Sequence, residues 1–109
     1  MGEAIIQRDE RGRIVGLTMQ PDGMSALAKA SATNLLRAVA ESLTDYLHVV
    51  VECSFEDEMY LEIDRSDQHL DREIDAILST MGRGLRLVER ENPDELIVSD
   101  AAVGVEVQA

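Results

Sequence analysis

The sequence is poor in aromatic residues: its 109 residues include no tryptophan, two tyrosines and one phenylalanine. A folded core must therefore consist of aliphatic side chains. Cys53 is the only cysteine, which excludes an internal disulfide and favours a reducing, cytoplasmic location. No stretch approaches the roughly 20 apolar residues that a membrane span needs. The first ten residues also lack the apolar core of a signal peptide, so we expect neither a membrane segment nor a leader.

Basic residues are also scarce, because 10 Lys and Arg face 22 Asp and Glu and give a net charge of −12. Such a surface repels phosphate backbones, so we expect no direct binding of nucleic acid. It attracts basic partners instead. The length predicts one domain, and 45% hydrophobic with 29% charged residues is typical of a globular protein.

The apolar pattern predicts the order strand, strand, helix, strand, strand, helix, strand, in which residues two apart or at helical spacing share a face. The expected strands cover 4–8, 14–20, 47–55, 58–64 and 96–99, and the helices cover 26–46 and about 67–91. We predict an α+β two-layer sandwich, with two helices on a mostly antiparallel five-stranded sheet whose other face is solvated or paired in a dimer. Residues 1–99 form the single domain, and the tail 100–109 either frays or adds an edge strand through Val103, Val105 and Val107.

Each predicted helix has one apolar stripe. In the first, Ser25 is the expected N-cap and the stripe is Ala28, Ala32, Leu35, Leu36, Val39 and Leu43. In the second, the stripe is Leu70, Ile74, Ile77, Leu78, Met81, Leu85 and Val88. Gly82 and Gly84 interrupt the second helix at a cost of about 1 kcal/mol each, which predicts tight packing against them.

A thiol hydrolase needs a thiolate and an imidazole within hydrogen-bond reach. Cys53 and His48 are five residues apart in the predicted strand 47–55, so they point to opposite faces. Cys53 falls on the apolar face with Val51, so we interpret it as a core residue and His48 as a surface residue. His69 has polar neighbours and no local partner.

Other candidate sites are weaker. The stretch 64–75 resembles a calcium loop, but His69 replaces the glycine at its sixth position and Asp75 the glutamate at its twelfth. Ser25 and Lys29 share a helical face, yet a cap followed by a solvated lysine explains them better. There is no phosphate-binding glycine loop and no zinc spacing, so we expect no metal and no cofactor. The acidic run Glu89, Glu91, Asp94 and Glu95 is interpreted as a solvated helix end.

Three segments resemble the ribosomal-processing cysteine protease family, Prp. They are Asp-Glu-Arg-Gly-Arg-Ile-Val at 9–15, Asp-Gly at 22–23 with the small-residue helix that follows, and the closing segment 77–98, Ile-Leu-Ser-Thr-Met-Gly-Arg-Gly-Leu-Arg-Leu-Val-Glu-Arg-Glu-Asn-Pro-Asp-Glu-Leu-Ile-Val. The resemblance covers roughly residues 4 to 99.

The family has a Gly-His-Ala motif after its second strand and a Cys-Ala-x-x-Ser motif at its first helix, and the histidine and cysteine of these motifs form its catalytic dyad. Gly23-Met24-Ser25 and the segment 29–33, Lys-Ala-Ser-Ala-Thr, stand in the corresponding places here. The resemblance therefore implies that Met24 and Lys29 occupy degenerate dyad positions. Methionine cannot relay a proton, and lysine is a cation near neutral pH.

The resemblance implies a catalytically inactive, homodimeric Prp-like protein that binds a basic ribosomal protein or its N-terminal extension. Its binding residues would be Gly23, Ser25, Ser31 and Thr33. Two alternatives stay open. One is a hydrolase with a relocated site, Ser25 or Ser31 with Lys29. The other is a dimeric interaction module unrelated to the ribosome.

Overall fold

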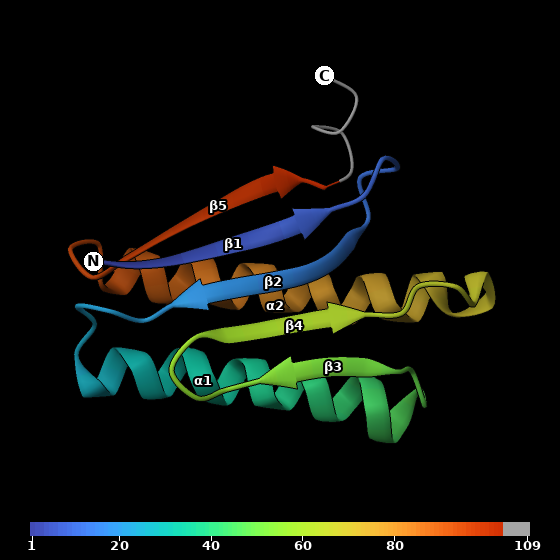
Figure 1. The fold of residues 1–109 in the computed structure, drawn as a ribbon, viewed down its shortest axis with the longest axis horizontal. Helices are drawn as coiled ribbons and strands as arrows, with labels where there is room; N and C mark the ends of the chain where they lie inside the picture. Colours follow the sequence, from blue (N-terminus) through green and yellow to red (C-terminus); the bar gives the residue numbers. More distant parts are fainter. Residues whose placement is uncertain (104–109) are drawn as a thin grey trace.

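The computed structural model of the chain describes residues 1–103. Its elements follow the predicted order (Figure 1). They are β1 (Gly2–Arg8), β2 (Ile14–Gln20), α1 (Ala26–Glu41) with the π-helical turn η1 (Ser42–Tyr46), β3 (Val51–Ser54), β4 (Met59–Ile63), the 3-10 turn η2 (Gln68–Leu70), α2 (Asp71–Glu91) and β5 (Leu96–Ala102). The first predicted helix thus reaches Tyr46 as expected, but its last turn is π-helical.

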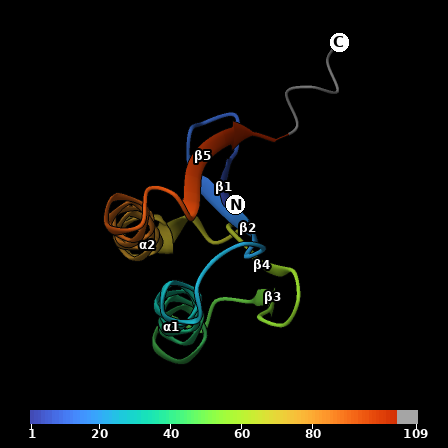
Figure 2. The same cartoon turned by 90° about the vertical axis from the view of Figure 1, so that its left-hand side faces the viewer.

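The five strands form one sheet in the order β3-β4-β2-β1-β5. β1 and β5 are parallel, and the other neighbouring strands are antiparallel. Both helices cover the same face of this sheet, and the opposite face is open (Figure 2). The predicted α+β sandwich of two helices on a mostly antiparallel five-stranded sheet is confirmed.

The core lies between the sheet and the helices and is aliphatic, as the composition predicts. Burial of one such side chain contributes about 1.5–3 kcal/mol. The largest fully buried side chains are Ile6, Leu17, Met19, Leu36, Leu43, Met59, Leu61, Ile74, Leu78, Met81, Leu85 and Leu96. Both predicted helical stripes face this core, with only Leu35, Leu70 and Ile77 partly exposed.

The alternation of buried side chains along β2 breaks near its start. Leu17 and Met19 are buried, but Val15 is half-buried and Ile14 is buried in its place. The register of the β1–β2 pair shifts at this point. An extra residue in one strand reverses the direction of the side chains beyond it.

Gly84 lies where α1 and α2 approach each other. A Cβ atom added there would be 2.6 Å from Cδ2 of Leu35, far inside ordinary contact. At Gly82 the nearest atom would be Cδ1 of Ile6 at 3.6 Å, an ordinary van der Waals distance. The predicted tight packing is therefore found at Gly84 and not at Gly82.

β3 is shorter than predicted. The strand expected over 47–55 covers only Val51–Ser54, because η1 extends the helix to Tyr46 and His48 then turns the chain at φ 57°. Cys53 pairs in register with the buried Leu61, so it does lie on the helix-covered face. It is nevertheless exposed, and the interpretation of Cys53 as a core residue is wrong. Cys53 lies on the edge strand β3, which has a neighbouring strand on one side only.

β5 is longer than predicted, since it extends to Ala102 rather than ending at Ser99. It is an edge strand, paired with β1 along its whole length. Residues 105 and 107, which the tail prediction also used, lie outside the described residues. Within residues 1–103, neither helix combines the length and the apolar sequence needed to cross a bilayer.

Candidate functional site

The junction between β2 and α1 contains the positions that the resemblance marks as functional. Pro21 ends β2, and the N–H of Met24 donates to the carbonyl oxygen of Pro21 (3.0 Å). Gly23 has φ 85° in this turn, the left-handed region that favours glycine. A Cβ atom at Gly23 would lie 2.8 Å from the backbone nitrogen of Met1. The turn therefore needs glycine for its conformation and for its close contact with the start of β1.

Met24 is a packing residue. Its side chain is half-buried and packs against the hydrophobic core. A Cβ atom at Gly2 would lie 2.6 Å from Sδ of Met24, so the thioether lies directly on the backbone of β1. Met24 thus closes the end of the sandwich beside the turn.

Glu95, in the loop before β5, holds the same junction from the other side. Its Oε1 accepts a hydrogen bond from the backbone N–H of Ser25 (2.5 Å), and its carbonyl oxygen accepts from the N–H of Gly2 (2.8 Å). The bond from Ser25 lowers the pKa of Glu95 below its ordinary value. Glu95 is therefore not simply part of the solvated acidic run that the sequence suggested. Its partner is 70 residues away in the chain, so no local pattern could have shown the contact.

Ser25 and Lys29 do not form a catalytic pair. Ser25 is the predicted N-cap, and its Oγ accepts from the N–H of Ala28 (3.2 Å). Lys29 is exposed, and within residues 1–103 its side chain makes no ion pair or hydrogen bond. A lysine base needs a desolvated amine beside the hydroxyl that it activates. The structure therefore counts against the relocated Ser/Lys site.

The four predicted binding residues do not share one surface. Thr33 lies on the β4 side of α1, where its hydroxyl donates to the carbonyl oxygen of Lys29 (2.7 Å) and lies 3.5 Å from Sδ of Met59. Ser31 is exposed one helical turn from Leu35, which packs on Gly84 of α2. Gly23 and Ser25 lie at the turn and the cap. A ligand that contacts this region therefore meets the N-terminal turn of α1, not a preformed pocket.

The thiol and the imidazoles of the chain are not assembled either. Cys53 is exposed on β3, and His48 is exposed in the loop before it. His69 lies in η2, where its backbone N–H donates to the carboxylate of Asp67 (3.0 Å). Within the described part of the chain, no hydrogen bond joins the sulfur of Cys53 to either ring.

The stretch that resembles a calcium loop is occupied by an ion-pair network. The buried guanidinium of Arg65 contacts the carboxylates of Asp71 (3.1 Å) and Asp75 (2.7 Å), which are therefore not free to bind a cation. Among residues 1–103, no group of three His, Cys, Asp or Glu side chains is placed to hold a metal ion.

The open face of the sheet is acidic. Four glutamates lie on this face: Glu3 on β1, Glu52 on β3, Glu62 on β4, and Glu58 directly before β4. Glu52 and Glu62 lie directly opposite each other in the β3–β4 pair, where two like charges destabilise a sheet. Together with Asp64 they line a shallow hollow of about 210 Å³. We call the four glutamates and Asp64 the acidic face.

Comparison with known proteins identifies the fold of this chain. No family model matches the chain, and no curated protein matches it by sequence. The ribosomal processing protease Prp from S. aureus does match in structure. In complex with a covalently linked product peptide it gives a TM-score of 0.79 at 14% identity, over 93% of this chain and 100% of that chain. In complex with a substrate peptide it gives 0.79 at 16% identity over the same shares. A protein from Streptococcus mutans gives 0.73 at 15% identity, over 94% and 95%.

These matches extend over nearly the whole of each chain, so the likeness includes both helices and all five strands. At 14–16% identity it establishes the arrangement of the backbone and not the chemistry. The chain described here has the fold of the Prp protease.

Proposed function

We propose that this chain is a peptide-binding protein with the Prp fold that does not cut its partner, and that the partner is a basic segment, such as that of a ribosomal protein. The proposal rests on one observation: the cysteine and the histidines of this chain do not lie together as a catalytic dyad. The β2–α1 junction holds Met24 and Lys29, while Cys53 is exposed on the edge strand β3 and, within residues 1–103, hydrogen-bonds to no imidazole.

The choice of a peptide follows from the fold matches, since Prp is known in complexes with a substrate and a product peptide. The choice of a basic peptide follows from charge. The acidic face gathers five carboxylates that form no ion pair within residues 1–103, on the side of the sheet opposite the two helices (Figure 2), in a chain of net charge −12. Lysine or arginine side chains of a partner would relieve the repulsion between Glu52 and Glu62.

The predicted homodimer stays a prediction. Pairing of two copies through the acidic face would set the glutamates of one copy against those of the other, at a cost in like-charge repulsion. We therefore propose that the acidic face binds the partner and that any dimer forms through another surface. Sedimentation velocity of the full chain at low and high salt measures the oligomeric state directly.

The test of function uses a fluorescent 15-residue peptide rich in lysine and arginine, with an acidic peptide as control. We expect saturable binding of the basic peptide that weakens with salt, and intact peptide by mass spectrometry after prolonged incubation. The double variant Glu52→Gln/Glu62→Gln should weaken binding about threefold or more. The matched variant Glu41→Gln/Glu73→Gln removes the same charge from the exposed helical surfaces and should have a smaller effect.

Cleavage of the peptide that disappears in Cys53→Ala would refute the proposal, because it would show a working thiol. Cleavage that disappears in Lys29→Ala would instead favour the relocated hydrolase. Equal affinity for the basic and acidic peptides would show that the acidic face does not select the partner.

A further inference from the structure

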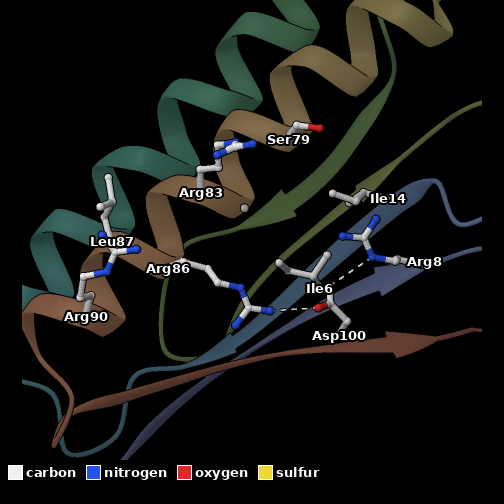
Figure 3. A pocket seen from close by; sticks show the side chains of 10 residues that line it. Ile6, Arg8, Ile14, Ser79, Arg83, Arg86, Leu87, Arg90 and Asp100 are labelled. Atoms are coloured by element: carbon white, nitrogen blue, oxygen red, sulfur yellow. Dashed lines mark hydrogen bonds and ion pairs between the residues drawn. The ribbon is translucent and has the colours of Figure 1, made fainter.

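A second charged feature lies on the opposite side of the molecule from the acidic face and has the opposite sign. A cavity of about 580 Å³ opens between α2 and the strands β1 and β5. Among residues 1–103, Arg8, Arg83, Arg86 and Arg90 line it, and Asp100 is the only acidic lining residue (Figure 3). We call these four arginines the arginine cluster. None of the residues that line the cavity belongs to the β2–α1 junction.

The composition makes this arrangement unusual. Acidic residues outnumber basic ones 22 to 10 in the chain, yet four of the ten basic residues meet at one cavity with a single carboxylate. Arg83, Arg86 and Arg90 follow one another along the same face of α2, where like charges repel. Glu89 is the nearest other acid, 3.7 Å from Arg86, and its carboxylate also accepts a hydrogen bond from the N–H of Val98.

Two members of the arginine cluster are fixed in place. Arg8 Nε lies 3.2 Å from Asp100, and its Nη1 donates to the carbonyl oxygen of Gly12 (3.0 Å). Arg86 donates to the carbonyl oxygen of Val98 (3.1 Å) and to the other oxygen of Asp100 (3.0 Å). The single carboxylate is thus shared by two guanidinium groups, as Figure 3 shows.

The other two members, Arg83 and Arg90, have no ion pair within residues 1–103. The cavity therefore keeps a net positive charge with free donors. Guanidinium groups match the paired oxygens of phosphate and carboxylate groups.

Apart from Ser79, the rest of the lining is apolar. Ile6 and Ile14 are buried at the floor, and Leu87 lies on the helical side. Gly82 provides no side chain there, which keeps the space above Ile6 open. A volume of this size is in the usual range for small-molecule sites, which combine an apolar lining with a few charged groups.

We propose that this cavity binds a small organic anion that carries at least two negative charges on phosphate or carboxylate groups and has an aliphatic body. The charged groups contact Arg83 and Arg90, and the aliphatic part lies over Ile6 and Ile14. The proposal is independent of the peptide-binding function, because no residue of the acidic face or of the β2–α1 junction takes part.

Isothermal titration of the full chain at constant ionic strength tests the site with three probes: pyrophosphate, citrate and acetate. We expect one-to-one binding of citrate, which has an aliphatic body, and weaker binding of pyrophosphate, which offers the charges alone. Acetate should bind at least about tenfold more weakly, because it offers a single charge.

Three variants distinguish binding in the cavity from general electrostatic attraction to the protein. Arg83→Gln/Arg90→Gln should weaken binding about tenfold or more, while Arg72→Gln, on the same helix but outside the cavity, should not change it. Gly82→Leu keeps all four guanidinium groups and fills the space, so it should also weaken binding. Thermal unfolding of each variant confirms that it is folded.

Equal loss of affinity in Arg72→Gln and in Arg83→Gln/Arg90→Gln would overturn the proposal, as would unchanged binding in Gly82→Leu. Binding of a short RNA without binding of pyrophosphate or citrate would also overturn it, because the arginine cluster would then serve a polyanionic chain.

Discussion

Nη2 of the buried Arg65 guanidinium lies 3.1 Å from Oδ1 of Asp71, in the first turn of α2. The same carboxylate also lies 3.0 Å from Nη1 of Arg13 in the β1–β2 hairpin. Arg65 donates in addition to the carbonyl oxygen of Ile14 (2.8 Å), and its buried Nε has no hydrogen-bond partner among residues 1–103. This network joins β2, the start of α2 and the segment after β4, so it fixes the second helix on the sheet.

Arg65→Ala should lower the free energy of unfolding by about 3 kcal/mol, because it removes a buried group with several charged hydrogen bonds. Urea unfolding monitored by circular dichroism measures the change. Arg72→Ala, an exposed residue of the same helix, should change stability by less than about 0.5 kcal/mol. Similar losses in the two variants would contradict a special role for Arg65.

Acid should destabilise the protein through its carboxylates. Burial tends to raise the pKa of Asp71, but the hydrogen bonds and charges of Arg65 and Arg13 outweigh it and hold the pKa below its ordinary value. A hydrogen bond from the backbone of Ser66 likewise lowers the pKa of Asp64. Such groups stabilise the fold above their unfolded pKa near 4, and the contribution is lost as the pH falls through the lower folded pKa.

The free energy of unfolding should therefore fall between about pH 5 and pH 3, and the fall should be shallower in Asp71→Asn. Urea unfolding at a series of pH values gives both slopes. Asp57→Asn, in the exposed turn between β3 and β4, provides the control and should retain the slope of the natural sequence. Identical slopes in Asp71→Asn and the natural sequence would exclude Asp71 as a source of acid sensitivity.

The two glycines of α2 should respond in opposite directions. Gly82→Ala should stabilise the chain by up to about 1 kcal/mol, since alanine favours the helix and its Cβ meets only ordinary contact. Gly84→Val should destabilise it by about 1–3 kcal/mol, because the added atoms overlap Leu35. Thermal unfolding of both variants checks the contrast. A stabilised Gly84→Val would show that α1 moves away from α2 at little cost in free energy.

Ser25 should matter for stability and not for chemistry. Ser25→Ala removes the N-cap of α1 and should cost about 1 kcal/mol, whereas Ser25→Asn retains a good cap and should be close to neutral. Urea unfolding distinguishes the two. An ester hydrolysis activity lost equally in both variants would contradict this assignment and indicate a serine nucleophile.

Cys53 should react in the native protein. Its exposure on β3 predicts that a thiol-specific disulfide reagent titrates one thiol per chain without denaturant, nearly as fast as in the unfolded chain. Cys53→Ser should change the free energy of unfolding by less than about 0.5 kcal/mol. A thiol that reacts only after unfolding would place Cys53 in the core, as its sequence pattern suggested.

Apolar periodicity alone predicted the order of the elements, the two helical stripes and the two-layer α+β architecture. It could do so because each helix or strand must bury one face, and that requirement is written in spacings of 3.6 or 2 residues. The cap at Ser25 followed from equally local chemistry.

The sequence did not show which residues of an apolar face are exposed to solvent. Cys53 lies on the face that alternation assigns to it, yet it is exposed on the edge strand β3. Contacts between distant segments were equally invisible. Glu95 binds the N–H of Ser25, and Asp100 meets Arg8 and Arg86, only because β5 pairs in parallel with β1.

Local patterning thus determined which faces are apolar and in what order they occur, because neighbouring residues share one helix or strand. Tertiary structure alone decided which charges meet, since the arginine cluster and the acidic face are assembled from strands and helices whose pairing depends on long-range register.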